Sequence, residues 1–293
     1  MSTSGTVFTA KVFNLFARPA LLGVFLLPLV CLNGPAIAQS PDPTQADQLL
    51  NTFTADSFQT DLFTGASTAQ IPIQVPSAAA GLAPKITLRY ASTGIDEIKV
   101  SQQASGAGLG WTLDTGGFII RDMKGTAGAT DDTFKLIFGG ASYDLIKIDS
   151  TNQIYHTRDE SFLKVQHFST GDYWVVTTKD GLQHRFGFNT DSKQIGLTVD
   201  LKTAITWRYY LDEVKTTSGV SIRYAYSKIT AHPKGSTKNY DQVVYLDWIT
   251  YAYRNGVLVG PQREIHFIRA LRNDWKDTTQ GTIISLHEKE RLD

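Results

Sequence analysis

The chain has 293 residues, of which 28 are basic and 28 are acidic, so its formal net charge at pH 7 is zero. This balance gives no electrostatic reason to expect nucleic acid as a partner. About 250 residues follow an N-terminal leader, enough for one large domain or two smaller ones. Frequent glycines and aromatic residues, without long apolar helical stripes, favour an all-β fold.

Residues 1–38 are predicted to be a signal peptide. Lys11 and Arg18 form a positive front, residues 20–32 are apolar, and Ala36-Ile37-Ala38 offers a small-x-small cleavage site. The apolar run is short for a membrane span. We therefore expect export to the outside of the cell or its surface, with no membrane span after cleavage; an uncleaved anchor is the alternative. Cleavage would also remove the only cysteine, and with it any disulfide or thiolate ligand.

Residues 39–62 are polar and are predicted to form a flexible lead-in, in which a short helix over 46–53 is conceivable. The opening segment, residues 63–125, then shows apolar alternation over 71–75 and 86–90, which predicts half-buried strands. Pro72 has no N–H to donate, so its strand is expected at a sheet edge or beside a bulge. The architectural residues of this segment are Gly65, Ile71, Pro72, Ile73, Pro76, Gly81, Pro84, Tyr90, Gly108, Gly110, Trp111 and Arg121.

Residues 126–293 are predicted to form successive antiparallel hairpins. Strands over 134–138 and 142–148 flank Gly139-Gly140, a dipeptide that tolerates the positive φ of tight turns. Further strands are expected over 162–168, 173–178, 182–188, 205–214, 220–226, 243–253 and 263–269. In the strand over 182–188, the even-numbered residues are expected to share one face. The chain stops at Asp293 inside a predicted strand, so we expect it to be the N-terminal part of a longer protein.

These features resemble the SpvB/TcdB toxin family, which is the N-terminal region of toxin-complex B components and of related Rhs/YD-repeat proteins. The opening segment carries the resemblance through Ile71-Pro72-Ile73, Val75-Pro76, Gly81-Leu82-Ala83-Pro84, Leu88-Arg89-Tyr90 and Gly108-Leu109-Gly110-Trp111, closed by Arg121. Similar matches continue at Thr178-Lys179-Asp180-Gly181, Trp207, Tyr210-Leu211 and Ser218-Gly219, so the resemblance extends over about residues 63–293. Asn273 departs from it, since a proline would be expected there.

The resemblance implies an all-β, Rhs-like shell segment, with part of a propeller as a further possibility. It implies a secreted, non-catalytic role in virulence, in which the shell of an insecticidal toxin complex encloses or delivers a C-terminal toxin or effector region. That region, and any enzyme activity, would lie beyond residue 293 or on a partner chain, with other toxin-complex subunits as further partners. Arg121 is expected to meet backbone carbonyls or an acid where the opening segment closes.

The residues themselves give little sign of catalysis. The six histidines show no metal-ligand spacing, and residues 106–110 are followed by a predicted strand rather than the helix that a phosphate-binding loop requires. We therefore predict no cofactor and no metal, and a tight turn that brings Trp111 into the core. Glu288 and Glu290 resemble the paired glutamates of arginine-specific ADP-ribosyltransferases, which makes a toxin fragment of that class one alternative.

Aromatic residues support another alternative, a secreted or surface-attached β-sheet module that binds a glycan or a protein in the manner of an adhesin. Trp174, Trp207, Trp248 and Trp275 could line such a surface. Because tryptophans in strands more often pack against neighbouring strands, core packing is the favoured use of these side chains. The sequence thus predicts a β-sheet wall, with these two alternatives left open.

Overall fold

A computed structural model describes residues 58–60, 65–78, 81–96, 104–126, 130–198, 200–233, 236–273, 278–280, 284–286 and 290–292. The chain divides into two compact units, Met1–Leu49 and Leu50–Asp293, and every described residue belongs to the second. The predicted signal peptide and the helix over 46–53 lie outside the described residues. No helix within the described ranges is long and apolar enough to cross a membrane.

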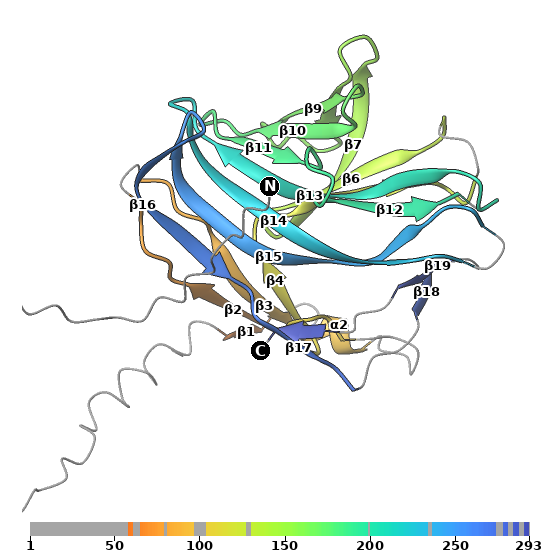
Figure 1. Cartoon of the computed structure of the whole chain (residues 1–293), viewed down its shortest axis with the longest axis horizontal. Helices are drawn as coiled ribbons and strands as arrows, with labels where there is room; N and C mark the ends of the chain where they lie inside the picture. The colour runs from red at the N-terminus through yellow and green to blue at the C-terminus, as the bar shows by residue number, and fades with distance from the viewer. Residues whose placement is uncertain are drawn as a thin grey trace, which may run out of the picture. The chain divides into compact units, whose positions relative to one another are not determined.

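The described residues form an almost entirely β structure with antiparallel pairing throughout, as predicted (Figure 1). The only helix among them is the short α2 (Thr93–Asp96). The opening segment builds a four-stranded sheet in sequential order. Its strands are β1 (Phe58–Thr60), β2 (Ser67–Ile73), β3 (Ile86–Ala91) and β4 (Trp111–Asp114).

The turns of the opening segment have the predicted chemistry. Gly81 has a φ of 79°, and its N–H donates to the Ala78 carbonyl at 2.8 Å, so the chain reverses between β2 and β3. Pro72 pairs with Thr87 on β3 and lies beyond the part of β2 that pairs with β1. The described strands therefore give Pro72 a partner on one side only, which agrees with the predicted edge position. β1 itself falls within the predicted flexible lead-in.

The larger sheet contains a closed ring of eight strands, because β11 pairs with β10 on one side and with β13 on the other, while β13 also pairs with β5. The ring strands are β5 (Phe118–Asp122), β6 (Thr133–Phe138), β7 (Ala141–Asp149), β8 (Ile154–Thr157), β9 (Lys164–Phe168), β10 (Tyr173–Thr177), β11 (Gln183–Phe186) and β13 (Ala204–Lys215). A predicted contribution to a propeller stays a prediction.

Each ring strand supplies at least one buried apolar side chain to a common core, so the ring is filled with side chains. These residues are Ile119, Leu136, Leu145, Tyr155, Val165, Trp174, Phe186 and Tyr209. Trp174 is fully buried, at 0% exposure, and its ring lies 4.7 Å from that of Phe134 and 4.8 Å from that of Tyr155. The predicted core role of Trp174 is therefore confirmed.

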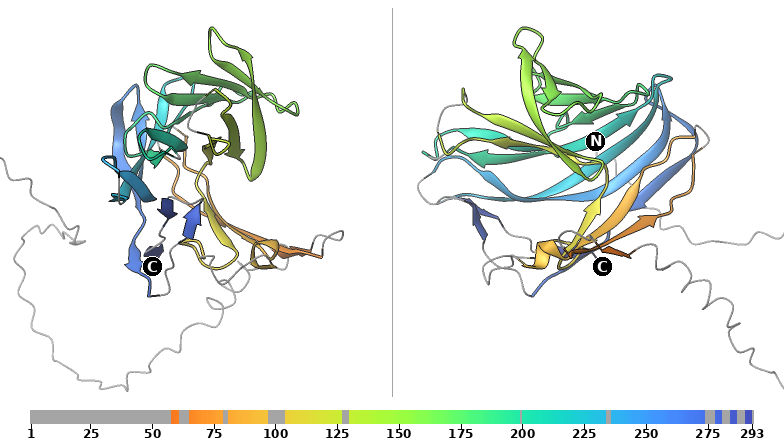
Figure 2. Two further views of the ribbon diagram at one scale, coloured as in Figure 1. Left: turned by 90° about the vertical axis from the view of Figure 1, so that its right-hand side faces the viewer. Right: turned by 180° about the vertical axis from the view of Figure 1, so that it is seen from behind.

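Long strands extend the sheet beyond the ring, and Figures 1 and 2 show β13, β14 and β15 running side by side. The added strands are β12 (Lys193–Leu197), which pairs with β13, and β14 (Val220–Ala231), β15 (Tyr240–Arg254) and β16 (Val257–His266), which follow β13 in order. Two short pairs complete the described strands: β17 (Arg269–Leu271) with β20 (Glu290–Leu292), and β18 (Thr278–Gln280) with β19 (Ile284–Leu286).

The predicted hairpins are confirmed in their pairing. Phe138 pairs with Ala141 across Gly139 and Gly140, whose φ values are 61° and 83°. The even-numbered face over 182–188 is only partly correct. His184 and Phe186 are buried, but Phe188 is exposed, because the register shifts after Arg185 and Gly187 takes a φ of 72°. The strands β8, β12, β18 and β19 were not predicted.

Candidate functional site

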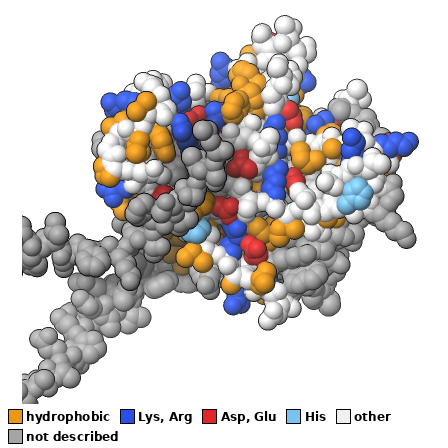
Figure 3. Space-filling model, viewed as in Figure 1, with side chains coloured by type: hydrophobic (Ala, Val, Ile, Leu, Met, Phe, Trp, Pro, Cys, Tyr) orange, Lys and Arg blue, Asp and Glu red, His pale blue; other side chains and the backbone are white. Residues whose placement is uncertain are grey.

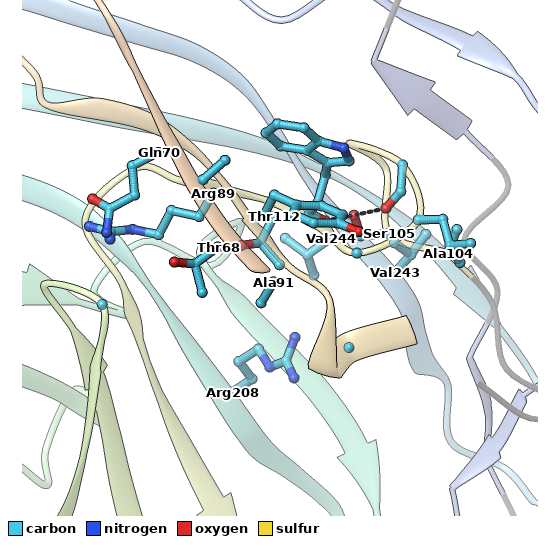
Figure 4. A pocket seen from close by; sticks show the side chains of 18 of the residues that line it. Thr68, Gln70, Arg89, Ala91, Ala104, Ser105, Thr112, Arg208, Val243 and Val244 are labelled. Atoms are coloured by element: carbon cyan, nitrogen blue, oxygen red, sulfur yellow. Dashed lines mark hydrogen bonds between the residues drawn. The ribbon is translucent and has the colours of Figure 1, made fainter. Parts of the chain in front are cut away.

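A pocket of about 940 Å³ lies between the small sheet and the long strands of the larger sheet. β2, β3 and β4 line one part of it, the turn before β4 another, and β12, β13 and β15 a third, with Gly94 and Gly140 also in the lining. Figure 4 shows Thr68, Arg89 and Ala91 of the small sheet on one side and Arg208 of β13 on the other. Its volume falls at the upper end of the range for small-molecule sites.

The turn at one wall of the pocket is held by a single serine and a distant arginine. The Ser105 hydroxyl accepts from the Ala107 N–H at 3.2 Å and also contacts the carbonyl of Trp111. Arg272 donates to the carbonyls of Ala104 at 2.7 Å and Ser105 at 3.1 Å, which ties this turn to a segment more than 160 residues later in the chain. The turn leads into strand β4, as predicted, and offers no helix N-terminus to a phosphate.

Gly110 brings the turn close to the small sheet. Its φ is 74°, and a Cβ at this position would lie 2.8 Å from the ring of Tyr90. The Gly110 carbonyl accepts from the N–H of Ala91 at 3.0 Å, and the rings of Tyr90 and Trp111 lie 5.2 Å apart. Four of the predicted architectural residues (Tyr90, Gly108, Gly110 and Trp111) therefore meet at this pocket. Trp111 is only partly buried, so it lines the pocket instead of entering the core as predicted.

The other architectural residues lie away from the pocket. Three of them lie within β2 (Ile71, Pro72 and Ile73), and three lie in the segment between β2 and β3 (Pro76, Gly81 and Pro84). Gly65 precedes β2 with a φ of 70°. The Pro76 carbonyl accepts from the buried Tyr251 hydroxyl at 2.9 Å, which joins the opening segment to β15. Arg121 does meet an acid: its Nε lies 2.5 Å from the Oδ2 of Asp132, next to the ring of Phe134.

Two arginines line the pocket, and its described lining contains no acidic side chain. Arg89 is neutralised from behind by Asp114, whose Oδ2 lies 3.1 Å from the Arg89 Nε. Arg208 has no carboxylate within ion-pair distance among the described residues. Among the residues that the structure describes, Arg208 is therefore the pocket cation without a counter-charge, and it sets the electrostatic character of the lining.

Aromatic rings surround the guanidinium of Arg208. Its Cζ lies 4.6 Å from the ring centroid of Trp207, 4.7 Å from that of Phe118 and 5.9 Å from that of Tyr210. Its Nη1 donates to the Tyr210 hydroxyl across a long 3.4 Å, while its Nε is buried without a hydrogen-bond acceptor in the described structure. A buried donor left unpaired costs about 1–3 kcal/mol, so this arrangement requires an explanation.

Gln194 of β12 completes this wall. It is buried, it pairs in register with Arg208, and its side-chain carbonyl accepts from the Tyr210 hydroxyl at 3.0 Å. Sequence reasoning missed both Gln194 and Arg208. Neither residue stands in a motif, and they become neighbours only because β12 folds back onto β13, so the local sequence carries no signal for them.

A second polar cluster lies in the ring around Asp172. This carboxylate accepts hydrogen bonds from Tyr209 at 2.8 Å and Thr206 at 2.8 Å, and it lies 3.1 Å from Nε2 of His167. Burial opposes ionisation of Asp172, but the hydrogen bonds from His167, Thr206 and Tyr209 outweigh it and lower its pKa from 3.8 to about 2. The cluster links β9, the turn before β10 and β13.

The remaining candidates are placed as structural residues where the structure describes them. His184 is buried, and this burial lowers its pKa to about 4, so it stays neutral near pH 7. No group of three or more histidine, cysteine or acidic side chains among the described residues could hold a metal ion. The Oε2 of Glu290 lies 2.7 Å from the Nε of Arg269, and the backbone N–H of Glu290 donates to the Tyr245 hydroxyl. Glu288 and Trp275 lie outside the described residues.

The other tryptophans divide between core and surface. Trp207 is buried, in agreement with core packing, and it also lines the pocket. Trp248 is 36% exposed and stacks on His266 with ring centroids 3.8 Å apart. In Figure 3, acidic and basic side chains are interspersed on the visible face, in line with the balanced charge of the sequence.

The sequence matches no protein-family model and no curated protein. Solved structures, in contrast, do match. The crystal structure of TcdB2-TccC3-TEV gives a TM-score of 0.50 at 20% identity, and the match covers 78% of this chain and 12% of that chain. The N-terminal domain of the effector protein SpvB from Salmonella typhimurium strain LT2 gives a TM-score of 0.48 at 16% identity, over 76% of this chain and 85% of that one.

The chain thus spans only 12% of the length of the TcdB2-TccC3-TEV chain that it matches. A match at 20% identity compares architecture and says nothing of shared activity. The predicted resemblance is confirmed at that level: this chain has a fold similar to that of one part of the TcdB2-TccC3 toxin-complex structure.

Proposed function

We propose that this chain is a non-catalytic structural part of an exported Rhs/toxin-complex-like protein, in which it forms the start of a β-shell around a C-terminal toxin or effector region. The observation that carries the proposal is the fold similarity to the TcdB2-TccC3 structure, which extends over 78% of this chain. The predicted signal peptide supports export to the outside of the cell or its surface. The cargo would belong to the same chain or to a partner.

The packing of the described residues supports a wall-like role. The ring is filled by the side chains of its own strands. Lys135 pairs with Asp144 across neighbouring ring strands, and Arg185 pairs with Asp212 and Glu213. Asp212 is fully buried, with its Oδ1 2.6 Å from the Nε of Arg185, and its other oxygen accepts from the Phe188 N–H. Such networks fix strand positions and leave no acid free for chemistry at that point.

The proposal makes a direct genetic prediction. Sequencing of the DNA beyond codon 293 is expected to reveal an open reading frame with repeated Tyr-Asp motifs followed by a distinct C-terminal domain. An immediate stop codon would contradict the shell. When the full-length protein is expressed, limited proteolysis is expected to release the C-terminal domain only after the shell is cut, and free accessibility of that domain would count against enclosure.

The non-catalytic assignment has its own test. Because Glu290 is engaged by Arg269, we expect the purified chain to release no nicotinamide from the nicotinamide dinucleotide. Release that is lost in Glu290→Gln would overturn the assignment in favour of an ADP-ribosyltransferase.

A further inference from the structure

We propose that the pocket around Arg208 binds a monocarboxylate saccharide, an acidic sugar whose carboxylate meets the Arg208 guanidinium. This inference goes beyond the shell role and does not depend on it. It rests on the composition of the pocket, the state of Arg208 and the position of aromatic rings, each described above.

The first step is the charge of the site. The described lining holds Arg89 and Arg208 and no acidic side chain. Because Asp114 neutralises Arg89 at 3.1 Å, one positive charge of the described lining remains for a ligand. A single arginine matches the charge of one carboxylate, whereas a phosphate dianion would call for a second cation.

The second step is the geometry of Arg208. Its Nε is buried and has no hydrogen-bond acceptor in the described part of the chain, and the rings of Phe118, Trp207 and Tyr210 lie around the guanidinium. The terminal Nη groups are therefore the part of Arg208 that can meet an anion from the pocket. Two parallel N–H donors on a planar group fit the two oxygens of a carboxylate, and the rings hold the guanidinium plane in place before the ligand arrives.

The third step is the rest of the lining, which suits a neutral, hydroxyl-rich body. Polar side chains in the lining include Gln70 and Thr112, and the Tyr90–Trp111 pair provides flat apolar faces. Hydroxyl groups of a sugar can both donate to and accept from such side chains, while the C–H face of the ring packs on an aromatic surface. An acidic peptide side chain would use the arginine but little of this lining.

The test is calorimetric titration of the full chain with sodium glucuronate, glucose, glucose 6-phosphate and N-acetyl-aspartate amide. We expect glucuronate to bind and the other three to bind at least about tenfold more weakly, since a charge-assisted pair contributes about 10- to 100-fold in affinity. Arg208→Gln should reduce glucuronate affinity by the same factor. Arg208→Lys should also lose most of the glucuronate affinity, because an ammonium lacks the two parallel N–H donors of a guanidinium. The exposed Arg263→Gln on β16 changes charge equally outside the pocket and should leave affinity unchanged.

Several results would overturn the proposal. These are no glucuronate binding by the wild type, equal binding of glucose, tighter binding of glucose 6-phosphate, preference for the aspartate derivative, or full affinity in a folded Arg208→Gln protein. Thermal melting of each variant establishes its folding. If Arg208→Gln does not fold, the variant Ala91→Glu provides the test, because Ala91 lines the pocket opposite Arg208. The introduced carboxylate should pair with the Arg208 guanidinium and abolish glucuronate binding. Unchanged glucuronate binding in this variant would refute the site.

Discussion

Removal of the Arg121 side chain is expected to destabilise this protein more than any other single charge deletion near the opening segment. Arg121 Nε lies 2.5 Å from Asp132 Oδ2, and the two side chains are 14% and 2% exposed. The second oxygen of Asp132, Oδ1, is buried without a hydrogen-bond partner among the described residues. Arg121→Ala would therefore leave a carboxylate inside the protein without its main partner.

The expected cost follows from that geometry. Breaking a buried ion pair by truncating one partner costs about 3–5 kcal/mol. Because Arg121 keeps some contact with solvent, we place Arg121→Ala at the lower end, about 3 kcal/mol. A unit of this size loses about 2–4 °C of melting temperature per kcal/mol, which predicts a decrease of about 6–12 °C.

Thermal melting and urea unfolding measure this decrease. Lys124→Ala is the matched control, since Lys124 pairs with Asp122 at 2.7 Å but both side chains are exposed, at 45% and 61%, and such pairs contribute at most about 1 kcal/mol. The double variant with Asp132→Ala should recover part of the loss, because it removes the stranded charge. An unchanged melting temperature in Arg121→Ala, or an equal loss in Lys124→Ala, would refute the reasoning.

Three further predictions concern pH and backbone geometry. The folded pKa of Asp172, about 2, lies below its ordinary value of 3.8. The unfolded chain therefore takes up the proton first, so the free energy of unfolding should decrease as the pH falls from about 5 to 2. Urea titrations should find this pH dependence weakened in Asp172→Asn. The pKa of His184 is about 4, below the ordinary 6.5, so stability should also decrease as the pH falls from about 6.5 to 4, and His184→Leu should flatten that window; an unaltered slope in either variant would contradict the assignment. Gly117 has a φ of 96°, and a Cβ there would lie 2.1 Å from the Ile137 carbonyl oxygen, whereas nothing lies within 4 Å of the corresponding position at Gly139. Gly117→Ala should therefore cost about 3 kcal/mol or more and Gly139→Ala about 1 kcal/mol, and equal losses would show that the clash is relieved at little cost.

The hairpins could be predicted because their turn residues are types that readily adopt the positive φ of a tight turn. Gly139 and Gly140 both adopt positive φ, which few other residues tolerate, and the flanking apolar residues then fix the pairing. β12 could not be predicted in the same way. Its residues Lys193–Leu197 include the buried Gln194, which a pattern of alternating polarity assigns to solvent.

The part of the candidate site that stands in a local sequence motif could be predicted, and the rest could not. Tyr90, Gly110 and Trp111 stand in a local motif, and they do meet at the pocket. Arg208 has no such motif, because its importance comes from the lack of a nearby acid among the described residues in three dimensions. Absences of that kind depend on which distant strands are neighbours, and a single sequence does not specify those neighbours.

The closure of the ring by β13 affects how the protein must be made. Ile119 on β5 pairs with Tyr209 on β13. The first strand of the ring therefore cannot complete its pairing until the whole of the intervening chain has been synthesised. During that interval β5 and β11 present unsatisfied backbone groups to any other nascent molecule. The yield of folded protein should therefore depend on whether a chaperone binds the polypeptide before β13 has been synthesised.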